Sequence, residues 1–132
     1  MSESTRPIFR PRHRLSHKRQ FDAVHAARMR VNAGPLTVLS CPNHKAFARL
    51  GMSVGRSFGN AVRRNRFKRR VREAFRLLLS TIPVVEPLDE RGCYDLVILT
   101  RPHDDPEPDQ YERWLGDAVR RLHAQWNTRL AR

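Results

Sequence analysis

One stretch decides most of the fold, residues 60–80, which read NAVRRNRFKRRVREAFRLLLS. Its apolar residues recur at the three- and four-residue spacing of one helix face, which predicts a helix from Ala61 to about Ser80. Asn60 stands where an N-cap residue would accept the first free backbone N–H groups. The side buried against the rest of the protein would then carry Phe67, Val71, Ala74, Phe75 and Leu78.

The opposite side of this helix is basic. Between Arg56 and Arg76 there are nine basic residues and a single acid, Glu73. A face that is merely solvated usually mixes charges of both signs at i,i+4 spacing, and this one does not. The pattern favours a rigid basic surface that binds a polyanion, mainly through phosphates. At about 100° per residue, the residues that line up opposite the apolar stripe are Asn65, Arg69, Arg72 and Arg76.

The composition supports the same interpretation. The chain has 132 residues, 39% of them hydrophobic, which is enough for one compact domain and argues against general disorder. Lys and Arg number 26 against 13 Asp and Glu, and this net charge of +13 favours a nucleic-acid partner. No apolar run is long enough for a membrane span or a signal peptide, so we expect a cytoplasmic protein and no membrane partner.

The rest of the sequence predicts an α+β fold, an α–β sandwich with one small central sheet and three helices. Ser16 is predicted to cap a first helix that ends near Arg28, and Gly34-Pro35 breaks the pattern after it. Asp109 opens a last helix with an apolar stripe. The predicted strands are 36–41, 48–54 and 93–100, and the last stripe is Tyr111, Leu115, Ala118, Val119, Leu122 and Trp126. The expected organisation is a flexible basic arm (1–12), a single domain (13–127) and a tail (128–132).

The sequence contains no recognisable catalytic or metal-binding constellation. Cys41 and Cys93 are far apart in β-like segments, which favours two free thiols inside the fold. The acids gather late in the chain in proline-rich loops such as 102–108, where charge balance and solubility account for them. We therefore expect no catalytic residue, no protein-bound metal and no protein-bound cofactor.

Residues 51–75, GMSVGRSFGNAVRRNRFKRRVREAF, resemble the signature of the ribonuclease P protein component. The centre of the resemblance is Arg64-Asn65-Arg66, followed by basic residues and Glu73 at the family's spacing. Arg14-Leu15 with Phe21, and the strand before Arg101, are also similar to the family. The resemblance extends over roughly residues 12 to 127.

The resemblance implies a fold in which the Arg-Asn-Arg helix lies in a left-handed crossover, against the usual right-handed default. It also implies two RNA surfaces, one for the catalytic RNA of ribonuclease P and one for the single-stranded 5′ leader of precursor transfer RNA. Catalysis and the Mg²⁺ ions would then belong to the RNA subunit, and no DNA partner is expected. The implied residues for the catalytic RNA are Arg64, Asn65, Arg66, Lys68, Arg69 and Arg72, and those for the leader cleft are Phe21, His25, Leu39, Ser53 and Arg56.

Three other functions are compatible with the charge and size. A structural or ribosomal RNA-binding protein would have the same composition, and the Arg-Asn-Arg segment argues against it. A DNA-binding regulator would need a helix-turn-helix pair and a dimer interface, neither of which the sequence suggests. A self-sufficient nuclease would need converging carboxylates for its metal ions.

Overall fold

The computed structural model describes residues 11–79 and 92–130, and these form three α-helices, two short 3₁₀ helices and four strands. The chain passes from a 3₁₀ turn into a short helix, through three strands, and then into the basic helix. A fourth strand and a long helix complete it. The elements are η1 (Pro11–His13), α1 (Lys18–Ala26), β1 (Arg30–Ala33), β2 (Leu36–Pro42), β3 (Arg49–Ser53), η2 (Arg56–Phe58), α2 (Ala61–Leu78), β4 (Tyr94–Thr100) and α3 (Gln110–Leu130).

The sheet is mixed, with the strand order β1-β2-β4-β3. The β1–β2 and β2–β4 pairs are antiparallel, and β3 runs parallel to β4. Helix α2 connects these two parallel neighbours, so the basic helix is the crossover of a β-α-β unit. Central strand β4 is buried on both faces at Leu96, Val97 and Ile98, as its apolar run predicts.

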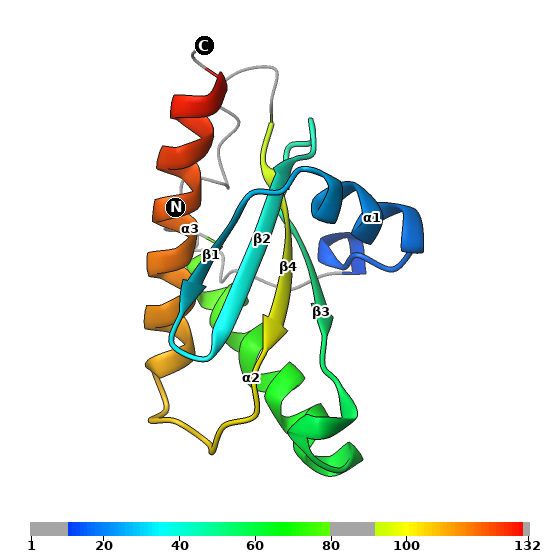
Figure 1. The fold of residues 1–132 in the computed structure, drawn as a ribbon, viewed down its shortest axis with the longest axis vertical. Coiled ribbons are helices and arrows are strands. Elements are labelled where there is room, and N and C mark those ends of the chain that lie inside the picture. Colours follow the sequence, from blue (N-terminus) through cyan, green and yellow to red (C-terminus); the bar gives the residue numbers. More distant parts are fainter. Residues whose placement is uncertain (1–10, 80–91, 131–132) are drawn as a thin grey trace, which may run out of the picture.

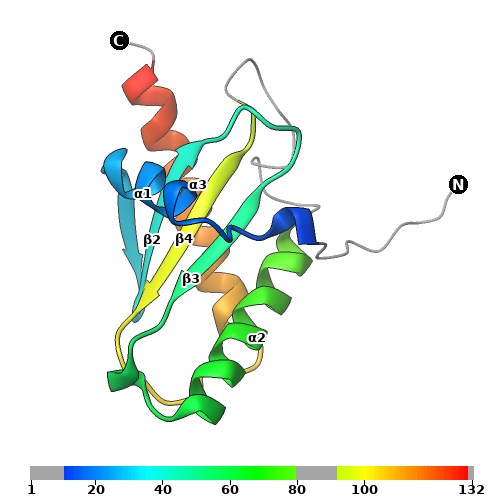
Figure 2. The same cartoon turned by 90° about the vertical axis from the view of Figure 1, so that its right-hand side faces the viewer.

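The sheet lies between two unequal helical layers. Helices α2 and α3 cover one face, and the short helix α1 lies on the other (Figures 1 and 2). The larger core fills the α2–α3 side, whereas a smaller cluster under α1 contains Leu15, Val24, Leu39 and Val97. The predicted sandwich of three helices on one small sheet is therefore confirmed.

Both long amphipathic helices bury the stripes that their periodicity predicts. On α2, Phe75 is fully buried and all the other stripe residues are at most 7% exposed. On α3 the stripe from Tyr111 to Trp126 is likewise buried, and the Trp126 indole N–H donates a 2.9 Å hydrogen bond to Ser40 Oγ beneath it. The predicted cap is also confirmed, because Asn60 Oδ1 accepts a 2.9 Å hydrogen bond from the Arg63 N–H.

Two expectations need correction. Ser16 does not cap α1: the helix begins at Lys18 after His17, and Gln20 Oε1 accepts the backbone N–H groups of Ser16 and His17. The Gly34-Pro35 break is in fact the turn of a β-hairpin whose first strand, β1, is missing from the sequence prediction. Gly34 has a φ of +57°, and the Trp114 ring lies so close that a Cβ there would be 2.4 Å from it.

The ends of the domain differ slightly from the expected boundaries. Most of the predicted basic arm lies outside the described residues, but Pro11–His13 forms a 3₁₀ turn. Immediately after it, Leu15 donates its N–H to the Leu50 carbonyl oxygen at 2.9 Å, and Arg14 bridges to Leu50. The start of the domain therefore lies along the outer edge of β3. At the other end, α3 continues to Leu130, past the expected boundary at residue 127.

Cys41 and Cys93 are both free thiols, as predicted, with Cys93 buried and Cys41 half-buried. Burial raises the pKa of each thiol to about 11. Next to Cys41, the buried Asp95 carboxylate receives two hydrogen bonds from the Arg49 guanidinium, at 2.8 and 2.7 Å, which tie β3 to β4. No helix among the described residues is long and apolar enough to cross a membrane.

Candidate nucleic-acid interface

The basic residues of α2 separate into two flanks and an outward line. The loop flank, Arg63, Arg66 and Arg70, faces the segment between β4 and α3. The hollow flank, Lys68 and Arg72, faces β3 and the start of the domain. The outward line between the flanks contains the exposed residues Asn65 and Arg69. Arg64 is half-buried at the edge of the apolar stripe and donates a 2.7 Å hydrogen bond to the Gly59 carbonyl oxygen.

The guanidinium groups of the loop flank already have hydrogen-bond acceptors within the protein itself. Arg66 forms a 2.7 Å ion pair with Asp105, and Arg63 donates to the His103 carbonyl oxygen at 2.9 Å. Arg70 donates to the carbonyl oxygens of Pro106 and Glu107. The hydrogen bond from Arg66 is the main reason why the pKa of Asp105 lies below its ordinary value. An RNA phosphate would have to compete with these acceptors for the same guanidiniums.

A cluster of rings holds this loop against α2. His103 lies edge-on to Phe58 and Phe67, and its Nε2 is 2.6 Å from the Tyr111 hydroxyl oxygen. Arg70 stacks over the Tyr111 ring at 4.8 Å, and burial is the main cause that raises the pKa of Tyr111 to about 12. The loop is therefore fixed by packing as well as by charge.

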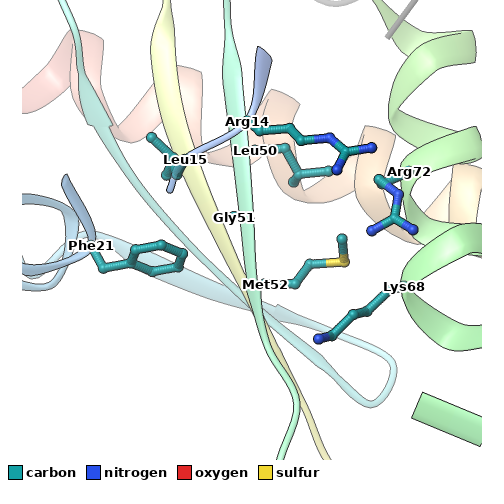
Figure 3. Close-up of a pocket in the computed structure, with 8 residues that line it drawn as sticks. All are labelled: Arg14, Leu15, Phe21, Leu50, Gly51, Met52, Lys68 and Arg72. Atoms are coloured by element: carbon teal, nitrogen blue, oxygen red, sulfur yellow. The ribbon is translucent and has the colours of Figure 1, made fainter. Parts of the chain in front are cut away.

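The hollow flank has different surroundings. Lys68 and Arg72 line a hollow of about 170 Å³, together with Arg14 from the start of the domain. Figure 3 shows these side chains on one side of β3 and Phe21 of α1 on the other. Gly51 makes the approach of Phe21 possible, because a Cβ there would lie 2.6 Å from the ring. The full lining is Arg14, Leu15, Phe21, Leu50, Gly51, Met52, Lys68 and Arg72.

Like charges crowd this hollow. In the described part of the chain neither Lys68 nor Arg72 forms an ion pair. Burial, and then the positive charges of Arg14 and Arg69, lower the pKa of Arg72. A bound anion would relieve this repulsion, which makes the hollow suitable for a phosphate beside an aromatic ring.

Below α1, one row of side chains crosses the sheet uncovered. Backbone pairing aligns Asn32 with Thr37, Thr37 with Leu99, and Leu99 with Ser53. All four are exposed or half-buried, whereas the neighbouring row, which contains Leu39 and Val97, is buried under α1. This open row, which consists of Asn32, Thr37, Leu99 and Ser53, begins beside the hollow that Phe21 lines, the Phe21 hollow. It has hydroxyl or amide side chains on both sides of the apolar Leu99.

The structure brings together some of the residues implied for the leader cleft. Phe21 lines the hollow, Ser53 lies on the open row, and Arg56 and His25 are exposed on η2 and α1. Leu39 is only 3% exposed, so its side chain supports the floor of the cleft and offers no surface of its own. Thr37 and Leu99 are absent from the residues that the sequence singles out for the cleft. The alternation of strand 36–41 could have identified Thr37 as a neighbour of Leu39 on the same face.

A small α+β domain with a strongly basic helix, a cationic hollow and an open sheet face is typical of the class of nucleic-acid-binding proteins. The comparisons with known proteins give the family. The family model described as Ribonuclease P matches residues 9–123. The chain therefore belongs to the ribonuclease P protein family, the protein component of an endoribonuclease holoenzyme that acts in transfer-RNA processing.

Curated relatives and solved structures agree with this assignment. The ribonuclease P protein component of Nitrosococcus oceani is 36% identical over 86% of this chain and 83% of its own. That of Thermotoga petrophila is 34% identical over 80% and 84%. The structure of the ribonuclease P protein from Thermotoga maritima has a TM-score of 0.69 at 28% identity and covers 82% of this chain and 96% of its own. The Staphylococcus aureus protein has a TM-score of 0.66 at 27% identity, with 82% and 93% covered.

Proposed function

We propose that this chain binds the catalytic RNA of ribonuclease P along α2, mainly through its outward line and hollow flank, and that it holds the 5′ leader of precursor transfer RNA in the Phe21 hollow and across the open row. Hydrolysis and its Mg²⁺ ions belong to the RNA in this proposal. The protein contributes affinity for the catalytic RNA and the precursor, and it positions the 5′ leader. The residues proposed for the catalytic RNA are Arg64, Asn65, Arg66, Lys68, Arg69 and Arg72, and those for the leader are Phe21, His25, Ser53 and Arg56, with Leu39 beneath them.

One observation carries the proposal, the hollow in which Phe21 and three cations meet. Proteins bind single strands by stacking bases on aromatic rings while positive charge follows the backbone. Lys68 and Arg72 belong to α2 and Phe21 belongs to α1, so a strand in the hollow would contact both proposed RNA surfaces. This supports a continuous path from the catalytic RNA to the leader.

We also infer that the β3-α2-β4 connection is left-handed. This is supported by the parallel, adjacent placement of β3 and β4 and by the position of α2 on the sheet face away from α1 (Figure 1). The consequence for function is that the basic side of α2 lies beside the outer edge of β3, next to the hollow.

Phe21→Ala should weaken binding of leader-bearing precursor while leaving mature transfer RNA nearly unaffected, because only the precursor has unpaired 5′ nucleotides to stack. A stacked base is worth about 1–3 kcal/mol, so the loss should be roughly 5- to 150-fold. Both RNAs are titrated at fixed salt against the assembled holoenzyme. His25→Phe should do the opposite and strengthen precursor binding through a larger stacking face.

Phe21 also packs on Gly51, so its variants need a control for folding. Phe21→Leu keeps an apolar side chain on Gly51 and removes the flat ring, and thermal melting is followed for both variants. Equal losses for precursor and mature RNA, or a Leu variant that binds precursor like the original protein, would show that Phe21 only fills the core.

A further inference from the structure

Val62 is the most exposed large hydrophobic residue of the described chain, with 71% of its surface open to solvent. It lies in the first turn of α2. A helix advances by about 100° per residue, which places Val62 between Asn65 and Arg66 and in line with Arg69. These three residues are also exposed. An isolated apolar side chain therefore lies in the middle of the basic outward line.

The fold gives no reason for a valine at this position. No described residue buries it, and valine is a poorer helix former than alanine by several tenths of a kcal/mol. An alanine would serve the helix at least as well. A partner that covers Val62 would give this residue a benefit that the isolated fold does not.

The surroundings of Val62 indicate the chemistry of that partner. Arg69 is exposed beside it, and the Asn65 amide hydrogen-bonds to no other residue in the described part of the chain. Cations on all sides favour a polyanion, but phosphate contacts alone would leave Val62 and Asn65 unused. A double-helical RNA segment has a wide, shallow minor groove that displays ribose carbons and 2′-hydroxyls between two phosphate rows. An apolar side chain suits the ribose carbons, and an amide can both donate to and accept from a 2′-hydroxyl.

We propose that Val62 and Asn65 make a non-ionic contact with the ribose face of a double-helical segment of ribonuclease P RNA, at the centre of an otherwise ionic interface. This inference rests on the proposed function, in which α2 docks on that RNA. It adds a component of affinity that salt does not screen, and it predicts that the helix prefers RNA to DNA.

The test is a salt series with the full chain and transcribed ribonuclease P RNA. Val62→Ala should lower affinity about three- to tenfold at every salt concentration, because two methyl-sized groups lose their contact. The slope of log K against log salt should stay the same, since no charge changes. Asn65→Ala should behave alike. Arg69→Gln should instead flatten the slope by about 0.7–0.9.

Leu130→Ala is the matched control, because Leu130 is another exposed apolar residue (46%) but lies on α3. It should bind like the original protein. If Val62→Ala also binds like the original while Arg69→Gln flattens the slope, α2 docks on RNA and the Val62 contact is overturned. If neither substitution has an effect, the docking of α2 itself is wrong.

A second measurement separates ribose from phosphate. A short RNA duplex and a DNA duplex of the same sequence are compared, and the original protein should prefer the RNA. The Val62→Ala and Asn65→Ala double variant should lose most of that preference and keep its affinity for DNA. An unchanged RNA-to-DNA ratio would overturn the ribose contact.

Discussion

On one side of α2, Arg63, Arg66 and Arg70 point to a loop that supplies a carboxylate and backbone carbonyl oxygens, and Arg70 also lies over the Tyr111 ring of α3. On the other side, Lys68 and Arg72 point to a hollow whose lining, among the described residues, adds a further cation, Arg14, and no acid. The two flanks belong to the same 18-residue helix and have the same chemistry. What differs is whether the protein has already provided acceptors for the guanidiniums.

This difference shows that the number of basic residues on a helix overestimates the charge available to a partner. Exposed ion pairs are weak, about 0.2–1 kcal/mol, so the loop flank is not closed to RNA. Any contact made there must nevertheless replace an existing one. The hollow flank gains the full benefit of a new phosphate, and we expect it to dominate affinity.

The largest expected effect is therefore a contrast between two double variants that each remove two charges. Lys68→Ala with Arg72→Ala should weaken binding of ribonuclease P RNA on the order of 10- to 100-fold at 0.1 M salt and lower the salt slope by about 1.5–2. Arg63→Ala with Arg66→Ala should cost only a few-fold, because those side chains already have partners. Affinity is measured across a salt series, with melting recorded for both. Equal losses would remove the distinction between the flanks.

A smaller effect should follow from releasing the loop flank. Asp105→Asn removes the carboxylate that competes for Arg66, so RNA affinity should rise, by at most about fivefold, the usual limit for an exposed ion pair. Asp117→Asn is the matched control, because Asp117 forms a similar exposed pair with Arg121, at 2.9 Å, on α3. If both substitutions tighten binding equally, the gain is only a consequence of net charge.

The smallest effect concerns pH. The pKa of Asp105 is lowered mainly by its hydrogen bond from Arg66, so Arg66→Gln should return it toward its ordinary value of 3.8. A carboxyl group whose pKa is lower in the folded protein than in the unfolded chain stabilises the fold at pH values above the unfolded pKa. That contribution is lost as the pH falls below about 4, through the folded pKa. Carboxyl NMR shifts measure the pKa. Glu73, whose pKa is lowered by Arg76, should not respond, and a similar change there would point to a global effect.

The helices could be predicted because their signals are local. The stripe from Phe67 to Leu78 and the cap at Asn60 depend on residues within a few turns of one another, and both are as expected. Strand β1 has only four residues, and Gly34-Pro35 after it predicts a break whether it ends a helix or turns a hairpin. The pairing of Ala33 with Leu36 decides between the two, and the sequence signals of so short a strand do not show it.

The candidate site shows the same division. The basic side of α2 can be predicted from the sequence, but the occupation of its loop flank cannot, because Arg66 and Asp105 are 39 residues apart. The acids of the proline-rich loop suggest solubility alone. In the structure one of them pairs with a residue of the Arg-Asn-Arg motif. The hollow was equally inaccessible to sequence reasoning, since it requires Arg14, Gly51 and Arg72 to meet from three separate elements.

The segment at Arg14 and Leu15 has one more consequence. Outer strands of a sheet present unpaired backbone groups that can template pairing with another molecule. The crossover makes β3 an edge strand of the sheet. The Leu15 N–H donates a hydrogen bond to the Leu50 carbonyl oxygen on β3, so the start of the domain covers part of this edge. The few residues before α1 thus leave less of this edge open for pairing with another sheet, and they do so beside the hollow to which Arg14 contributes its charge.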